Sequence, residues 1–263
     1  MTGHTPSPTA STVPDTGTGA DTRTGTLAIF DDKAAATRHL ADWLLQEALA
    51  KTEGPFSLAL SGGSTPQLLY SMMASEPYAS RFPWARMQFF LGDDRFLAHD
   101  HEDSNSGMLS RLLFSHVPVP AENVHLIPTA GTAEEAATTY EAELKAFYGA
   151  DTLQPGKPLF DVNLLGLGGD GHTASLFPGQ PVLKERTAWV STCVPPVAPY
   201  TRLTLTYPAI DASRHVVFLV EGASKRETVA KVRAQDPSCP ASAITSMGDL
   251  IWVLDRAAAP ADA

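Results

Sequence analysis

The sequence predicts an α/β fold in which helices cover both faces of a mostly parallel sheet. Short apolar runs typical of buried strands alternate with stretches whose apolar residues recur at helical spacing. Loops rich in glycine, serine or aspartate separate the runs from the helices, as in repeated strand–loop–helix units. With 263 residues, 43% of them hydrophobic, the chain can bury a substantial core.

The domain limits follow from composition. Residues 1–25 are rich in Thr, Gly, Pro and Ser and have almost no large apolar side chain, so we expect a disordered N-terminal tail. The alternating pattern then runs to residue 257 without an internal repeat or an obvious linker. We therefore expect a single α/β domain over residues 26–257 and a short C-terminal tail at residues 258–263.

The strands are predicted from apolar runs of four to six residues that are bounded by turn residues. In chain order they are Leu27–Phe30, Phe56–Leu60, Met87–Leu91, Val124–Ile127, Phe160–Leu165, Leu203–Tyr207, Val216–Val220 and Leu250–Leu254.

The helices are predicted from capping residues and apolar spacing. Asp31 or Asp32 can cap the first helix, and Pro66 suits the first turn of the second. Asp103 is the expected cap of a helix that ends at Phe114. The remaining expected helices are Thr132–Phe147 and Ala223–Arg233.

Charge and cysteine usage limit the function classes. A net charge of −10 argues against nucleic acid as a partner and requires that any anionic ligand be held by a local positive cluster. Cys193 and Cys239 have neither metal-site nor CxxC spacing, so we interpret them as reduced thiols of a cytoplasmic protein. No apolar run approaches the roughly 20 residues of a membrane span, and the N-terminus lacks a secretory signal pattern, so no membrane partner is expected.

Three loops follow three of the predicted strands, beginning at Ser61, Gly92 and Gly166. Because parallel strands present their carboxyl ends at one edge of a sheet, these loops are expected to converge there. Asp170 and His172 lie in the third loop, and a histidine at that edge is a candidate for acid–base chemistry.

The loop Ser61-Gly62-Gly63-Ser64-Thr65-Pro66 offers consecutive backbone N–H groups and hydroxyls, which suits a phosphate, although an ordinary capped turn has the same composition. Gly166-x-Gly168-x-x-Gly171 formally matches the dinucleotide fingerprint of oxidoreductases, but the acid expected roughly 20 residues later is missing.

Other candidates carry less information. Residues 99–103 read His-Asp-His-Glu-Asp, which are metal-ligand types, but a solvated acidic loop explains them better. Arg202 and Lys225 lie at the start of a strand and of a helix, and would matter only if they face the same crevice. The sequence has no GxSxG nucleophile elbow, and neither cysteine lies in a catalytic context. No residue is therefore predicted to form an acyl-enzyme.

Taken together, the motifs resemble the glucosamine-6-phosphate isomerase/6-phosphogluconolactonase family, and within it the lactonases, from about Leu27 to Leu254. The segments that carry the resemblance are Ser61–Pro66, Gly92–Arg95, Asp103–Asn105, Ala121–His125, Leu164–Gly179, Arg202–Thr206 and Pro240–Ser242. The lactonases usually have Asp-Glu-Arg where this chain has Asp93-Asp94-Arg95.

The resemblance implies a Rossmann-like three-layer sandwich of the sugar-phosphate isomerase/deaminase type. It implies hydrolysis of 6-phospho-D-glucono-1,5-lactone to 6-phospho-D-gluconate, without metal or other cofactor, by a monomer or homodimer. The alternative is a glucosamine-6-phosphate deaminase-like isomerase; those enzymes have Ala-Phe-Asn-Glu-Pro after the histidine, where this chain has no acid at residues 173–178. A non-catalytic sugar-phosphate sensor would be expected to lose His172 or to carry a DNA-binding segment.

The resemblance also implies roles for the site residues. His172 is expected to be the general base that activates water, and Asp170 or Asp93 to orient it. The lactone's phosphate is expected to bind to Ser61, Gly62, Gly63, Ser64 and Thr65 together with Arg95, Arg202 and Lys225.

Overall fold

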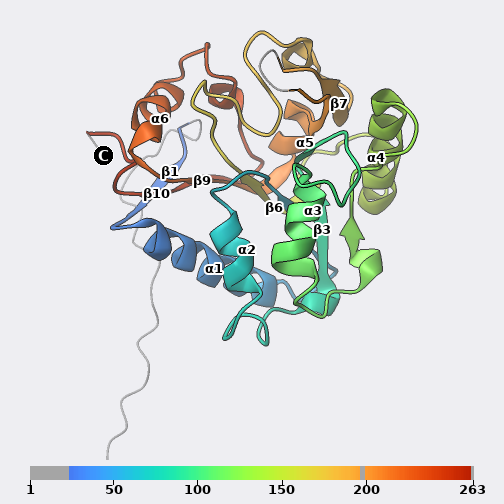
Figure 1. The fold of residues 1–263 in the computed structure, drawn as a ribbon, viewed down its shortest axis with the longest axis horizontal. Helices are drawn as coiled ribbons and strands as arrows, with labels where there is room; N and C mark the ends of the chain where they lie inside the picture. Colours follow the sequence, from blue (N-terminus) through green and yellow to red (C-terminus); the bar gives the residue numbers. More distant parts are fainter. Residues whose placement is uncertain (1–23, 196–198, 262–263) are drawn as a thin grey trace, which may run out of the picture.

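The computed structural model describes residues 24–195 and 199–261. The disordered tail predicted for residues 1–25 therefore lies almost wholly outside the described residues. Within them, seven parallel strands form the main sheet, in the order β1-β10-β9-β6-β2-β3-β5 (Figure 1). They are β1 (Thr26–Phe30), β2 (Phe56–Leu60), β3 (Met87–Leu91), β5 (Val124–His125), β6 (Phe160–Leu165), β9 (Ser213–Val220) and β10 (Asp249–Asp255).

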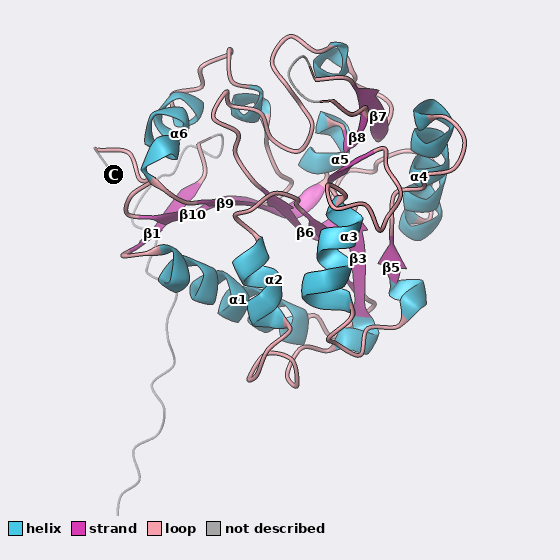
Figure 2. Cartoon of the chain, viewed as in Figure 1, coloured by secondary structure: helices cyan, strands magenta, loops and turns pink. Residues whose placement is uncertain are grey.

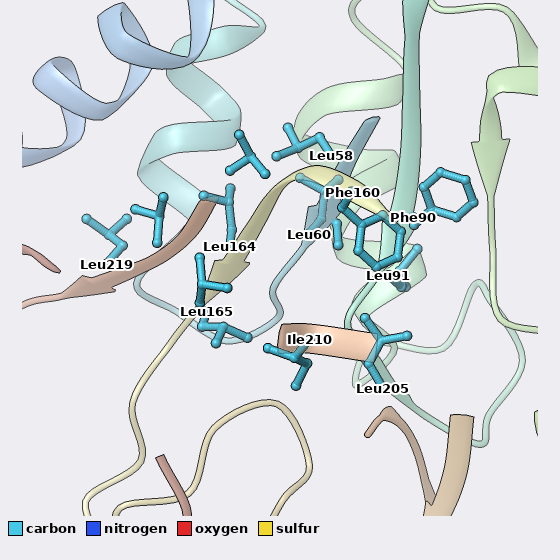
Figure 3. Close-up of a cluster of buried hydrophobic side chains, with 14 of the residues drawn as sticks. Leu58, Leu60, Phe90, Leu91, Phe160, Leu164, Leu165, Leu205, Ile210 and Leu219 are labelled. Carbon is cyan, nitrogen blue, oxygen red and sulfur yellow. The ribbon is translucent and has the colours of Figure 1, made fainter. Parts of the chain in front are cut away.

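The central strands are apolar because both faces of the sheet are covered. Every residue of β2 and β6 is buried, and β2 pairs in register with β3 along its whole length. Figure 3 shows Leu58, Phe90, Phe160 and Leu164 among the side chains of this core. The predicted parallel α/β class is confirmed.

The helices lie on both sides of this sheet: α1 and α2 are on one side of the β1–β10–β9 region and α6 is on the other (Figure 2). Their bounds are α1 (Lys33–Ala50), α2 (Gln67–Met73), α3 (Asn105–Leu109), α4 (Ala133–Tyr148), α5 (Tyr207–Asp211) and α6 (Arg226–Arg233). Asp32 caps α1 by accepting a 2.8 Å hydrogen bond from the Ala35 amide. Thr132 and Glu135 form a reciprocal capping box at the start of α4.

Two helix predictions were wrong in detail. Ser104, not Asp103, caps α3, because the Ser104 hydroxyl accepts a hydrogen bond from the Gly107 amide. The helix then changes to a π-helical turn over Ser110–Phe114. The segment predicted as one helix over Ala223–Arg233 begins with the 3-10 turn Ala223–Lys225 before α6.

A second, antiparallel sheet of three short strands packs beside the main one in the described residues. Its order is β4-β8-β7, with β4 (Asp93–Arg95), β8 (Arg202–Leu205) and β7 (Val190–Cys193). The strand predicted to end at Tyr207 ends at Leu205, because Pro208 lies in the first turn of α5 and that helix starts at Tyr207. β4 directly follows β3, so this small sheet extends the carboxyl end of the main sheet.

Near the C-terminus, Ala258 and Ala259 are buried, although they lie in the stretch predicted to be a tail. None of the helices in the described ranges is long and apolar enough to cross a membrane.

Candidate active site

The three predicted loops meet where β6, β2 and β3 end side by side. They border a cavity of about 250 Å³. Of the predicted site residues, all but Asp170 line it. The lining residues are Ser61, Gly62, Gly63, Ser64, Thr65, Pro66, Asp93, Arg95, Asn105, Gly166, Leu167, Gly168, His172, Thr173, Ala174, Arg202 and Lys225.

The loop after β6 holds the imidazole of His172 against the carboxylate of Asp170. The Nδ1 atom of His172 is 2.5 Å from Oδ1 of Asp170, and the same oxygen accepts the His172 backbone N–H at 3.1 Å. Burial acts to raise the pKa of Asp170, but the hydrogen bonds and charge of His172 outweigh it and lower the pKa. An ionised Asp170 can accept a hydrogen bond from the Nδ1–H group of a neutral imidazole, which leaves Nε2 of that tautomer as a proton acceptor.

Phe177 supports both the histidine and one arginine of the cavity. Its ring centroid is 4.2 Å from that of His172. The guanidinium carbon of Arg202 lies 5.9 Å from the same ring. Because Phe177 is itself buried, it offers a fixed apolar surface to both polar side chains.

Two arginines face each other across the small sheet. Arg95 of β4 and Arg202 of β8 are directly opposite in the antiparallel register. Burial, and then the charge of Arg95, lower the pKa of Arg202. The buried Nε atoms of both arginines have no hydrogen-bond partner in the described protein. Two guanidiniums with spare donors at one cavity have the charge and the geometry to bind an anion.

Lys225 adds a third positive group. Its ammonium donates a 2.7 Å hydrogen bond to the Leu167 carbonyl, in the same loop that carries His172. The other wall of the cavity is the Ser61–Thr65 loop, whose base is held by the Tyr70 hydroxyl donating to the Ser61 carbonyl at 2.6 Å. Gly63 has a φ of +89° in this loop, a conformation that glycine adopts without strain.

Asp93 and Asp170 occupy different environments. The Asp93 carboxylate is buried and accepts a 2.6 Å hydrogen bond from the Ser175 hydroxyl. Burial raises the pKa of Asp93, although the Ser175 hydrogen bond and the Arg202 charge oppose that shift. The acid in contact with the His172 ring is therefore Asp170, whereas Asp93 lies deeper, beside Ser175.

Sequence reasoning did not single out Asn105, Ser175 or Phe177 as site residues. Asn105 is part of a motif that resembles the family, and the other two follow His172 closely, but no local pattern shows that they contact the site. The 99–103 segment, in contrast, does not line the cavity. In that segment, the Nε2 atom of His99 forms a hydrogen bond with the Ile127 carbonyl, and the Asp103 carboxylate accepts a hydrogen bond from the Tyr200 hydroxyl.

Comparisons with known proteins match this chain to one family. The family model described as glucosamine-6-phosphate isomerases/6-phosphogluconolactonase matches residues 31–252. A 6-phosphogluconolactonase of Nostoc sp. is 38% identical over 240 residues, which are 89% of this chain and 96% of that protein. One of Synechocystis sp. is 41% identical over 219 residues, which are 81% of this chain and 87% of that protein.

Solved structures agree. The 6-phosphogluconolactonase from Trypanosoma cruzi superposes with a TM-score of 0.79 at 28% identity, covering 89% of this chain and 95% of that one. The enzyme of the same name from Thermotoga maritima has a TM-score of 0.74 at 27% identity, covering 88% and 99%. A monomeric glucosamine-6-phosphate deaminase has a TM-score of 0.73 but 21% identity, which shows a common fold alone.

Proposed function

We propose that this chain, which belongs to the glucosamine-6-phosphate isomerase/6-phosphogluconolactonase family, is a lactonase acting in the oxidative pentose phosphate pathway. It hydrolyses 6-phospho-D-glucono-1,5-lactone to 6-phospho-D-gluconate. The observation that carries the proposal is that His172, which is hydrogen-bonded to Asp170, lines the same cavity as Arg95, Arg202 and Lys225. A base and an anion site on one small cavity suit a phosphorylated ester.

In the proposed reaction, Nε2 of His172 takes a proton from water as the water oxygen attacks the lactone carbonyl carbon. The imidazolium that forms is stabilised by the ionised Asp170 on Nδ1. The proton then goes to the ring oxygen as the carbon–oxygen ester bond breaks, which yields the open acid. A positioned general base of this kind is worth about 10²- to 10⁴-fold in rate.

The phosphate is proposed to bind at the positive end of the cavity. Arg95 and Arg202 supply planar guanidiniums, which match phosphate oxygens in pairs, and Lys225 supplies a point charge. The Ser61–Thr65 loop contributes hydroxyls and backbone N–H groups. Because the whole chain is acidic, this local cluster has to overcome a repulsive far field.

The proposed location is the cytoplasm, because both cysteines are free in the structure and neither has the spacing of a disulfide framework. Some relatives are named as chloroplastic proteins. As a partner we propose only the phosphorylated sugar lactone, bound by a monomer or a homodimer.

The direct test is His172→Ala in an assay that follows acid release from freshly generated lactone, with spontaneous hydrolysis subtracted. We expect kcat to fall by about 100-fold or more, because the base is lost. The matched control is His116→Ala, which removes an exposed histidine that does not line the cavity and should leave kcat unchanged.

Near wild-type turnover by His172→Ala would rule out the assigned base. If the wild type instead released ammonia from glucosamine 6-phosphate and did not open the lactone, the lactonase proposal itself would be wrong. The phosphate site is checked separately with Arg202→Ala, which should weaken binding of the phosphorylated lactone far more than binding of plain gluconolactone.

A further inference from the structure

Asp94 is a buried carboxylate that does not line the cavity, yet it is surrounded by donors. It is 2% exposed. Its Oδ1 atom accepts the backbone N–H groups of Arg95 and Asn105, each at 2.7 Å. Its Oδ2 atom accepts the backbone N–H of Ser106 at 2.9 Å and the Ser106 hydroxyl at 2.7 Å. The Ser104 hydroxyl donates to the same oxygen at 3.2 Å.

These five donors come from two segments that the chain separates by about ten residues. One segment is β4, which carries Arg95 into the cavity. The other is the start of α3, where Asn105 and Ser106 have the unpaired amides of a helix N-terminus. A single carboxylate therefore ties the first turn of α3 to the strand that follows β3.

Asn105 links the hydrogen-bonded Asp94 carboxylate to the cavity. Its side-chain amide donates a 2.8 Å hydrogen bond to the Asp93 carbonyl, and its Oδ1 atom accepts a 3.3 Å hydrogen bond from Nη1 of Arg95. Gly62 packs directly on this amide: a Cβ atom on Gly62 would lie 2.1 Å from Oδ1 of Asn105. The Asn105 side chain thus sits between the arginine and the Ser61–Thr65 loop, and all three line the cavity.

We propose that Asp94 is the positioning residue of the anion-binding half of the site, acting through Asn105 on Arg95 and on the Ser61–Thr65 loop. This inference rests on the proposed function, in which Arg95 and the Ser61–Thr65 loop bind the phosphate of the lactone. Asp94 fixes where the guanidinium and the loop lie relative to each other before the ligand arrives, so that binding does not have to order them.

A carboxylate is required because every partner of Asp94 is a donor. Asparagine has nearly the same shape but replaces one acceptor oxygen with an NH₂ group. In Asp94→Asn that NH₂ group would face N–H or O–H donors, so at least one segment must move away. Glutamate keeps both acceptor oxygens on a chain one methylene longer, and is the residue usual at this place in the lactonases that the sequence resembles.

The experiment compares Asp94→Asn, Asp94→Glu and the control Asp161→Asn. Asp161 is also buried and also takes several hydrogen bonds, from Lys51 and from the amide and hydroxyl of Ser57. It lies near the amino end of β6, at the opposite end of that strand from the cavity. For each protein we would measure kcat and KM with the phosphorylated and the plain lactone, the Kd for 6-phosphogluconate and for gluconate, and the thermal unfolding midpoint.

In Asp94→Asn we expect KM for the phosphorylated lactone and Kd for 6-phosphogluconate to rise about tenfold or more, because misplacing a binding group by about 1 Å is that costly. The values for the unphosphorylated compounds should change much less. Asp94→Glu should recover most of the lost preference, whereas Asp161→Asn should unfold at a lower temperature with the preference unchanged.

An Asp94→Asn protein that is merely less stable, with the wild-type preference for phosphorylated ligands, would overturn the inference. So would a wild type that binds 6-phosphogluconate no better than gluconate. If the wild type binds 6-phosphogluconate selectively but does not open the lactone, the proposed function fails while the Kd values still decide the role of Asp94.

Discussion

Replacing Gly168 by alanine tests the proposed catalytic pair, His172 and Asp170, and leaves both residues in the chain. A Cβ atom on Gly168 would lie 2.0 Å from Nδ1 of His172 and 2.7 Å from Oδ1 of Asp170. Ordinary contacts to carbon need about 3.5 Å. Since Gly168 does not have a positive φ, the backbone accepts alanine, and the imidazole has to move by more than about 1 Å.

That movement breaks the hydrogen bond between the Asp170 carboxylate and the His172 ring. A displacement of this size costs about 100-fold in rate, which is about 2.7 kcal/mol in the barrier. The side chain of His172 is 30% exposed, so the ring can swing towards solvent without opening the core. We therefore expect kcat for the phosphorylated lactone to fall by about 100-fold, while the free energy of unfolding changes by less than about 1 kcal/mol.

The neighbouring glycine provides the control. A Cβ atom on Gly169 meets nothing within 4 Å, and Gly169 also lacks a positive φ. Gly169→Ala should keep wild-type kcat in the same lactone assay. The reasoning is refuted if Gly168→Ala turns over normally, or if Gly169→Ala is equally slow, because a general stiffening of the loop would then explain both.

Two further outcomes are expected. Phe177→Leu keeps an apolar side chain but removes the ring that contacts His172 and lies near Arg202. We expect kcat to fall about tenfold in the lactone assay and the free energy of unfolding to fall by about 1 kcal/mol. An unchanged kcat would show that the Phe177 ring does not hold His172 in place. Burial raises the pKa of Asp211 to about 6, so the stability that its protonated form provides is lost as the pH rises through that value. Asp211→Asn should therefore gain stability relative to the wild type between pH 5 and pH 7 in urea unfolding, and a pH-independent difference would contradict this.

The sequence predicted the main sheet well because buried parallel strands are continuous apolar runs. The observed bounds of Phe56–Leu60, Met87–Leu91 and Phe160–Leu165 are those predicted. The small sheet was not foreseen. β4 is Asp-Asp-Arg, which has no apolar pattern, and it becomes a strand only because residues more than 100 positions later pair with it.

The same holds for the site: the sequence predicted where its loops lie, but not the individual side-chain contacts within it. Its loops could be brought together from the sequence because the topology of parallel strands does so for any chain of this class. The contact of Ser175 with Asp93 and the place of Asn105 could not, because each depends on how one loop packs on another. Asp94 is the clearest case: the sequence predicts no role for it, whereas in the structure its carboxylate accepts hydrogen bonds from the amides at the start of α3.

The facing arginines link the fold to the proposed chemistry. Like charges directly opposite in an antiparallel pair destabilise a sheet, and Arg95 and Arg202 are such a pair. Neither carries a salt bridge to a carboxylate among the described residues, and their Nε atoms are buried without partners. The charges of the buried Asp93 and Asp94 carboxylates act to raise the pKa of Arg202 and so offset part of this repulsion. A phosphate bound at the proposed site would offset more of it, which links the arginine pair to the proposed chemistry.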